Sequence, residues 1–299
     1  MSTPLPPRRI AALHDLSCMG RCALTVILPT LSVMGYQVIP IPTALLSTHT
    51  GGFTDLHFRD LTADMEAISA HLDALDTSFS ALYTGFLGSA EQIDTVLHIL
   101  DRFGARPDET GTRPLILVDP VMGDDGDLYS TYNEHLVRGM RRISARADLL
   151  TPNLTEACLL TQTPYTDPQS MERDAALAFA DQLLNGLGKI CHGAIVITGI
   201  HLCDGTVANV GQKTDGTRFL VARDACHPSY PGTGDLFASV LLGAYLRSHD
   251  LRAATEAAAD FIRTVINASA QIPTPIRNGV ALEPELWRLA PNHLCLQNN

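Results

Sequence analysis

The sequence has no basic cluster longer than the pairs Arg8-Arg9 and Arg141-Arg142, and its formal net charge is −11. Proteins bind nucleic acids chiefly through clustered Lys and Arg side chains that neutralise phosphates. The charge pattern therefore argues against a nucleic-acid partner and favours a compact metabolic protein.

The sequence also has no cysteine pattern typical of a disulfide framework, because its seven cysteines are irregularly spaced. Cys18 and Cys22 resemble a metal pair, but no second Cys/His pair accompanies them, so a structural zinc site is not expected. Residues 1–9 lack the order of a signal peptide, and the apolar runs are too short to cross a bilayer. We expect a reduced, cytoplasmic protein without a membrane partner.

Internal repeats, low-complexity tracts and interdomain linkers are absent as well. A chain of 299 residues that is 45% hydrophobic and 18% charged can bury a sizeable core. We expect residues 1–299 to form one domain, with peripheral tails at about 1–8 and 291–299.

Short apolar, β-branched runs alternate with longer helical patterns. The predicted strands are Ile10–His14, Gln37–Ile41, Ser80–Thr84, Leu115–Asp119, Asp148–Thr151 and Ala194–Thr198. The predicted helices cover residues 21–34, 60–74, 89–103, 133–143, 168–186, 233–247 and 251–270. This alternation predicts an α/β fold with a doubly wound, mostly parallel central sheet and helices on both faces.

Two segments depart from the alternation. Thr206–Ala222 reads as two strands joined by a turn containing Asp215-Gly216, which predicts an antiparallel hairpin at one edge of the sheet. His49–Thr54 places glycines beside an aromatic residue within a strand-to-helix passage. This segment is either a small flap over a site or an ordinary surface loop.

The segment His227–Phe237 reads as a glycine turn that runs directly into a helix. Gly232 and Gly234 let the backbone approach a ligand closely, and the helix start attracts negative charge. The segment is either an anion site with Asp235 beside it or a plain helix start in which Asp235 only complements the dipole. An anion site next to a carboxylate would suit phosphoryl transfer.

Ligands of doubly wound sheets bind beyond the carboxyl ends of the strands, and polar residues follow three other predicted strands. Asp119 precedes a turn with three more acids, which is either a Mg²⁺ site or a solvated acidic turn. Asn153 and Glu156 form a capping pattern that would also suit a nucleotide site. Thr198-Gly199 is either a nucleotide contact or a simple turn.

Together these motifs resemble the ribokinase-like superfamily, and within it the pyridoxal, pyridoxine and pyridoxamine kinases. The resemblance covers most of the chain. The motifs shared with the wider superfamily are Gly232–Asp235, Asp119–Gly123 and Thr151–Glu156. Two further segments, Thr84–Ser89 and Ser47–Thr50, favour the kinases of vitamin B6.

The resemblance implies ATP-dependent phosphorylation of the 5′-hydroxymethyl group of a B6 vitamer. Asp235 would be the general base, and the backbone of Gly232, Thr233 and Gly234 would form an anion hole for the transferring phosphate. The remaining implied ATP contacts are Asp119, Thr151, Asn153, Glu156 and Thr198. Asp119 and Glu156 would organise Mg²⁺ with ATP, partly through water, and a monovalent cation such as K⁺ and a homodimer are further implications.

On the substrate side, Asp15 and Thr43 match ring-recognition positions of these kinases, with Ala44 adjacent. Many relatives have serine at the position of Asp15, and a carboxylate there would suit a protonated pyridine or an amine. Phe86 either stacks on the ring or belongs to the core. His49 either contacts the substrate or anchors its loop.

Two alternatives remain open. A hydroxymethylpyrimidine kinase with overlapping B6 activity would use the same motifs, because both substrates carry a hydroxymethyl group on a nitrogen heterocycle. A non-catalytic vitamer- or nucleotide-binding protein is the alternative of another class.

Overall fold

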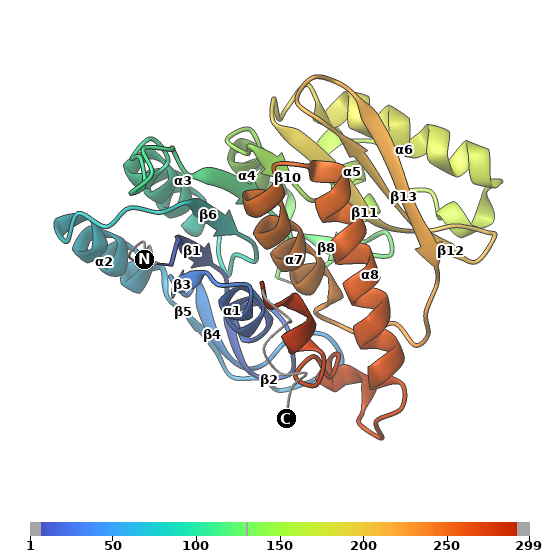
Figure 1. Cartoon of the computed structure of the whole chain (residues 1–299), viewed down its shortest axis with the longest axis horizontal. Helices are drawn as coiled ribbons and strands as arrows, with labels where there is room; N and C mark the ends of the chain where they lie inside the picture. Colours follow the sequence, from blue (N-terminus) through green and yellow to red (C-terminus); the bar gives the residue numbers. More distant parts are fainter. Residues whose placement is uncertain (1–6, 130, 292–299) are drawn as a thin grey trace, which may run out of the picture.

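The computed structural model describes residues 7–129 and 131–291, so most of the predicted tails lies outside the described residues. An eight-stranded sheet lies at the centre, in the order β13-β12-β11-β10-β7-β6-β1-β3 (Figure 1). Its six parallel strands are β1 (Arg9–Leu13), β3 (Gln37–Pro40), β6 (Ala81–Thr84), β7 (Leu115–Val118), β10 (Leu149–Leu150) and β11 (Ala194–His201). The predicted parallel sheet is confirmed.

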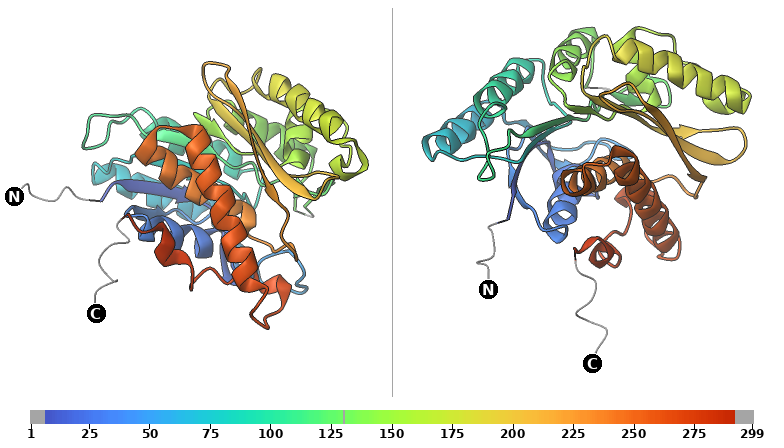
Figure 2. Two further views of the ribbon diagram at one scale, coloured as in Figure 1. Left: turned by 45° about the vertical axis from the view of Figure 1, so that its right-hand side comes forward. Right: turned by 45° about the horizontal axis from the view of Figure 1, so that its top comes forward.

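Helices cover both faces of this sheet, as the two further views in Figure 2 show. One face carries α1 (Leu24–Val33), α7 (Thr233–Ser248) and α8 (Leu251–Ser269), whose apolar side chains form one core cluster. The other face carries α2 (Thr62–Ala74), α3 (Gln92–Phe103), α4 (Glu134–Ser144), α5 (Leu154–Thr161) and α6 (Arg173–Leu187). Successive residues of β1 alternate between the clusters, because neighbouring side chains of a strand point to opposite faces.

The predicted hairpin forms the antiparallel edge of the sheet. It consists of β12 (Thr206–Gln212) and β13 (Arg218–Asp224), and β12 pairs antiparallel with β11. The turn has Gly216 at φ +84°, a left-handed conformation that glycine adopts without strain.

Helix α5 was not among the helices that periodicity predicted, although its start was read correctly as a capping pattern. Asn153 accepts a hydrogen bond from the Glu156 backbone, and the Glu156 side chain accepts one from the Asn153 backbone. The helix is short and buried around most of its circumference, so its sequence has no polar face. A capping box identifies such a helix where hydrophobic periodicity does not.

A second, three-stranded sheet was not predicted. It consists of β2 (Leu16–Met19), β4 (Ala44–Thr48) and β5 (Phe58–Asp60), in the order β2-β4-β5. Because β2 follows β1 and β4 follows β3, this sheet lies beyond the carboxyl edge of the central sheet (Figure 1). Residues 49–54 lie between strand β3 and helix α2, as expected, but this passage also contains β4 and β5, and the segment connects those two strands.

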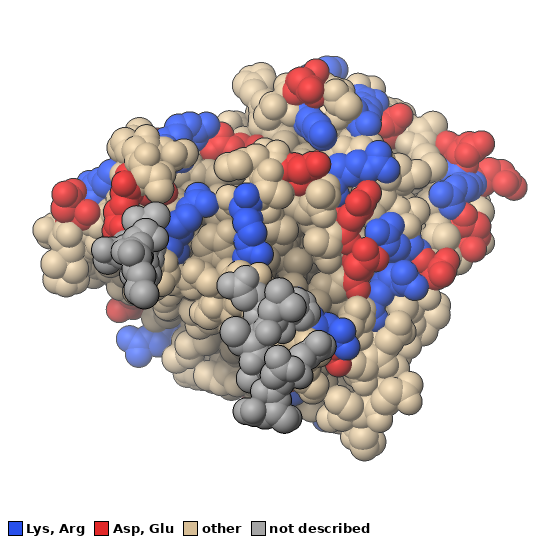
Figure 3. All heavy atoms as spheres, in the orientation of Figure 1, with Lys and Arg blue, Asp and Glu red and all other residues tan. Residues whose placement is uncertain are grey.

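The remaining two strands, β8 (Gly123–Asp124) and β9 (Asp127–Leu128), form a small hairpin after β7. Short 3-10 helices span Pro168–Ser170, Ile276–Asn278 and Leu286–Leu289. Within residues 7–129 and 131–291, no helix is both long and apolar enough to cross a membrane. On the face shown in Figure 3, basic side chains are interspersed with acidic ones.

Candidate active site

The register of the central sheet aligns the ends of four parallel strands. Leu13 pairs with Thr84, Thr84 with Val118, and Val118 with Leu150. The residues that follow these strand ends therefore form one row along the carboxyl edge. That row is His14, Gly85, Asp119 and Thr151.

Asp235 reaches this row from the first turn of α7. Its Oδ2 atom accepts a hydrogen bond from the Ala23 backbone at 2.8 Å, and its Oδ1 atom lies 4.0 Å from Nδ1 of His14. Burial raises the pKa of Asp235 to about 7, an effect that the Ala23 hydrogen bond opposes and the charge of Asp15 reinforces. A carboxylate that titrates near neutral pH is suited to general base catalysis.

The glycine turn before Asp235 has the backbone required of an anion site. Gly232 is the N-cap of α7 at φ +80° and supplies no side-chain cap, so the first backbone N–H groups of the helix are available to a ligand. A Cβ atom on Gly232 would lie 1.9 Å from the Arg21 carbonyl oxygen, whereas one on Gly234 would meet nothing within 4 Å. The turn is thus packed on one side and open on the other. The Thr233 hydroxyl donates to the Tyr230 carbonyl.

Two buried carboxyl groups, Asp119 and Glu156, lie near Asp235. Burial raises the pKa of Asp119 well above its ordinary range, and the charges of Glu156 and Asp235 raise it further. Burial raises the pKa of Glu156 to about 8, against two stabilising hydrogen bonds from the backbones of Asn153 and Met122. The charge of Asp235 raises the pKa values of both Asp119 and Glu156, and such a group of acids favours a bound cation.

The carboxylate groups of Asp119 and Glu156 are ligands that fit Mg²⁺. Within the described part of the chain, no group of three or more His, Cys, Asp and Glu side chains has the arrangement of a direct metal site. No residue in the described ranges 7–129 and 131–291 donates a hydrogen bond to the Asp119 carboxylate. Mg²⁺ is commonly bound by one or two carboxylates together with waters and nucleotide phosphates, and Asp119 and Glu156 suit that mode.

Three of the predicted nucleotide contacts come together where β10 ends beside β11. The predicted strand end at Thr198 was wrong, because β11 continues to His201 past an irregularity between Ile197 and Ile200. Asn153 and Thr198 form an isolated parallel bridge, and the Thr198 backbone N–H donates to the Pro152 carbonyl at 2.9 Å. The buried Thr151 hydroxyl lies 3.4 Å from the Val118 carbonyl, its acceptor. Gly199, at φ +67°, has open space where a side chain would be.

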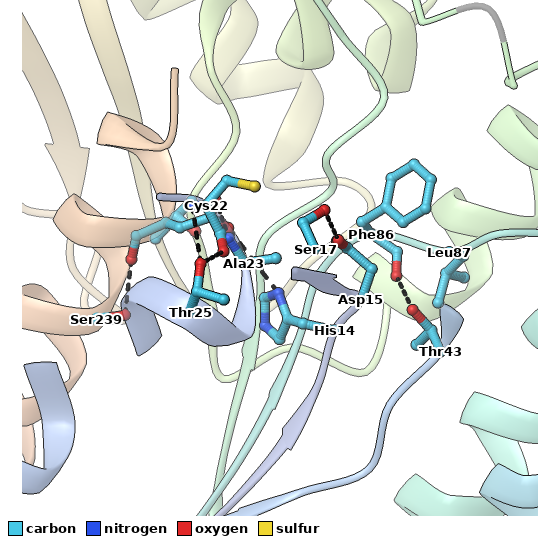
Figure 4. Close-up of polar contacts among 12 residues, drawn as sticks. His14, Asp15, Ser17, Cys22, Ala23, Thr25, Thr43, Phe86, Leu87 and Ser239 are labelled. Atoms are coloured by element: carbon cyan, nitrogen blue, oxygen red, sulfur yellow. Dashed lines mark hydrogen bonds and ion pairs between the residues drawn. The ribbon is translucent and has the colours of Figure 1, made fainter. Parts of the chain in front are cut away.

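The predicted ring-recognition residues Asp15, Thr43 and Phe86 lie together on one side of His14 in Figure 4, and Ser239 of α7 lies on the other. Asp15 is buried, and its Oδ2 atom accepts a hydrogen bond from the Ser17 hydroxyl at 2.8 Å. Burial raises the pKa of Asp15 to about 6, despite that hydrogen bond. The buried Thr43 hydroxyl donates to the Phe86 carbonyl at 2.9 Å, with the buried Ala44 next to it.

Phe86 is 8% exposed and belongs to the core cluster, with its ring centroid 6.2 Å from that of Tyr132. Phe86 therefore contacts the predicted substrate residue Thr43 through its backbone carbonyl and the core through its ring.

His49 anchors its loop. Its Nε2 atom lies 2.6 Å from the Arg277 carbonyl oxygen, and its Nδ1 atom accepts the Gly51 backbone N–H at 3.1 Å. The guanidinium of Arg277 lies over the Phe53 ring, 5.0 Å from its centroid. Both ring nitrogens of His49 are thus occupied, which corresponds to the anchoring alternative in this conformation.

Two residues near Asp235 were not among the predicted site residues. His14 follows the end of β1 and is fully buried, and a reading of polar residues at strand ends would have included it beside Asp15. Cys22 was considered only for zinc. Burial raises the pKa of the Cys22 thiol, and the charges of Asp15 and Asp235 raise it further. Figure 4 shows Cys22 next to Ala23, the residue whose backbone N–H binds Asp235.

Comparison with known proteins supports the relationship that the motifs indicated. Residues 15–277 match the phosphomethylpyrimidine kinase family. A pyridoxine/pyridoxal/pyridoxamine kinase of Bordetella avium is 30% identical over 283 residues, which cover 90% of this chain and 89% of that protein.

Two solved structures have the same fold. A Bacteroides thetaiotaomicron protein, provisionally named a phosphomethylpyrimidine kinase and crystallised with pyridoxal, superposes with a TM-score of 0.84 at 35% identity, covering 97% of each chain. Pyridoxal kinase from Lactobacillus plantarum superposes with a TM-score of 0.82 at 28% identity, covering 94% of this chain and 96% of that one. The predicted fold and the predicted relationship to pyridoxal kinases are confirmed. The chain belongs to the phosphomethylpyrimidine kinase family of the ribokinase-like superfamily.

Proposed function

We propose that this protein transfers the γ-phosphoryl group of ATP to the 5′-hydroxymethyl group of a vitamin B6 vitamer. The observation that carries the proposal is the position of Asp235, which stands at an open helix start beside the buried acids Asp119 and Glu156. A base, an anion hole and a cation site at one sheet edge are the parts that phosphoryl transfer requires. The relatives named above include pyridoxal kinases and a structure with pyridoxal.

In the proposed reaction, the substrate hydroxyl oxygen attacks the γ-phosphorus and its proton passes to the Asp235 carboxylate. The bond between the γ-phosphorus and the bridging oxygen breaks, and ADP leaves. Backbone N–H groups of Gly232, Thr233 and Gly234 stabilise the charge on the transferring phosphoryl group. Asp119 and Glu156 would hold Mg²⁺, partly through water, and the bound ion would neutralise phosphate charge.

Recognition of the substrate is assigned to Asp15, Thr43, Ala44 and Phe86, with His49 contributing through the loop that it anchors. Recognition of ATP is assigned to Thr151, Asn153 and Thr198. A homodimer in the cytoplasm and a monovalent cation such as K⁺ complete the proposal, on the strength of the family resemblance. We further propose that residues 1–299 form a single kinase domain.

A substrate panel tests the assignment. Purified protein with Mg²⁺ and ATP is given pyridoxal, pyridoxamine, pyridoxine or hydroxymethylpyrimidine, and both ADP and the phosphorylated product are measured. We expect kcat/KM to be highest for a B6 vitamer. The family match favours hydroxymethylpyrimidine as the second candidate substrate, and far higher efficiency with it than with every vitamer would replace the B6 assignment.

The variant Asp235→Asn separates an enzyme from a binding protein. Removal of a general base typically lowers kcat by about 10²–10⁴-fold, while folding and vitamer binding stay largely intact. Full turnover in this variant would remove Asp235 from the role of base. Absence of turnover in the unmodified protein with all four substrates would favour a binding function.

A further inference from the structure

His14 is a fully buried polar side chain whose ring has no hydrogen bond. It is 0% exposed, and neither Nδ1 nor Nε2 has a hydrogen-bond partner in the described ranges 7–129 and 131–291. A buried polar atom without a partner destabilises the folded protein, so such an atom calls for a functional explanation. Oδ1 of Asp235 lies 4.0 Å from Nδ1 of this ring.

The surrounding residues are arranged to hold this ring. Gly85 packs against it so closely that a Cβ atom at that position would lie 2.2 Å from Cε1 and 2.3 Å from Nδ1 of His14. On another side, Tyr83 contacts the imidazole edge-on, with ring centroids 4.3 Å apart. The imidazole therefore has little freedom to turn away from Asp235, and Figure 4 shows its ring beside the labelled Asp15 and Ala23.

The protonation state of His14 determines whether its ring can donate or accept a proton at the site. Burial lowers its pKa to about 3, so the imidazole is neutral at physiological pH and carries one N–H group. A neutral imidazole with that proton on Nδ1 directs a donor at the Asp235 carboxylate. A buried imidazole of such low basicity is a poor acceptor for the substrate's proton, which leaves donation as its function.

We propose that His14 is a positioning residue for the proposed kinase reaction: its Nδ1–H donates to Oδ1 of Asp235 when substrate is bound. The distance of 4.0 Å has to shorten by about 1 Å for this bond, and catalytic hydrogen bonds commonly tighten on forming the substrate complex. With Ala23 donating to Oδ2, the carboxylate is then held from both oxygens. Its remaining lone pairs face the substrate hydroxyl in a fixed direction.

This inference rests on the proposed function, because it assigns His14 a part in the same reaction. It also predicts an effect on the titration of the base, since a donor to the charged form of a carboxylate lowers its pKa. The other titratable groups around Asp235 and His14 act on the same titration. They are Asp15 after β1, Cys22 before α1, Tyr83 on β6, Asp119 after β7 and Glu156 on α5.

Two substitutions separate positioning from packing. His14→Phe keeps a ring of similar size and removes the unpartnered polar atoms, so we expect its melting temperature to equal or exceed that of the unmodified protein. His14→Asn leaves a cavity and lowers the melting temperature, but its amide N–H takes the place of Nδ1–H. We expect kcat to fall about 10- to 100-fold in His14→Phe, with KM changed less than about twofold, and to fall less in His14→Asn.

Which of the two variants has the higher kcat decides between positioning and packing. If His14 only fills space, the more stable His14→Phe is the more active variant, and that result would overturn the proposal. So would a kcat of His14→Phe within twofold of the unmodified value. The acidic limb of the pH profile of kcat provides an independent measure, and we expect it to move to higher pH in His14→Phe.

A second measurement distinguishes failure of this inference from failure of the proposed function. If the unmodified protein phosphorylates no B6 vitamer, the function is wrong, and the titration of Asp235 still tests the contact. Its carboxyl resonance is followed by ¹³C NMR with pyridoxal and a non-hydrolysable ATP analogue present, and Asp235→Asn identifies the signal. An Asp235 pKa that is higher in His14→Phe supports the contact, and an unchanged pKa removes it.

Discussion

Burial of Asp235 makes this residue costly to the folded protein, because its pKa rises from 3.8 to about 7. The unfolded chain releases the proton near pH 4, while the folded protein retains it up to about pH 7. Between these values the folded state binds more protons than the unfolded state, so its stability falls as pH rises. The charged form of Asp235, the proposed base, therefore lowers the stability of the folded protein.

The variant Asp235→Asn tests this cost. An uncharged amide of nearly the same shape can still accept the Ala23 N–H, so we expect the free energy of unfolding to increase by on the order of 1–3 kcal/mol at pH 8. The gain shrinks as pH falls from 7 to 4 and disappears below pH 4. Urea unfolding at pH 8 and at pH 4 measures the difference, and an equal effect at both pH values would contradict the assignment of the gain to the carboxylate charge.

Individual site residues could be predicted where they follow an apolar strand. Asp119 and Thr151 were found because each stands after a buried run, and Asp235 because two glycines precede it at a helix start. His14 was missed although it stands at a strand end, because only its complete burial and its distance to Asp235 distinguish it from other polar residues at such positions. The spacing of residues within a motif does not predict contacts between residues more than 200 positions apart in the sequence.

At the scale of the element, the turn before α7 depends on Gly232 for two reasons. Its φ of +80° is a left-handed conformation, and its missing side chain lets the Arg21 carbonyl approach. We expect Gly232→Ala to destabilise the protein by about 2 kcal/mol or more and to abolish turnover, because the turn has to move away from Arg21.

Gly234→Ala is the matched control, since a Cβ atom there meets nothing within 4 Å. This variant should keep the melting temperature of the unmodified protein. Because its methyl group points into open space at the helix start, we expect a raised KM for ATP. Thermal unfolding and ATP-dependent turnover of both variants check the contrast, and equal loss of stability in the two would show that the turn is not packed as described.

Elements were predictable where local pattern and tertiary role agree. The six parallel strands are short apolar runs, and the hairpin carries an Asp-Gly turn, so pattern was sufficient for both. The sheet of β2, β4 and β5 was not predictable, because all three residues of β5 are exposed and β2 has one fully buried residue. Such strands are defined by their pairing partners and not by their own hydrophobicity.

At the scale of the whole molecule, the site collects carboxyl groups from separate parts of the chain. Asp119 follows β7, Glu156 lies in α5 and Asp235 in α7, and each is raised in pKa by burial. A ligand that brings positive charge to this edge therefore binds to groups that have to lose protons first. Binding and folding are linked through those protons.

This linkage gives a prediction for Mg²⁺ with ADP. We expect the rise in melting temperature on adding both to be larger at pH 8.5 than at pH 6.5, because Glu156, with a pKa of about 8, is mostly charged only at the higher pH. Chelation of the metal with EDTA should remove most of this pH-dependent part. In Asp119→Asn, which lacks one of the two acids assigned to the cation, the remaining rise should be smaller and less dependent on Mg²⁺. A rise that is the same at both pH values, and is unaffected by EDTA, would mean that these acids do not hold the cation.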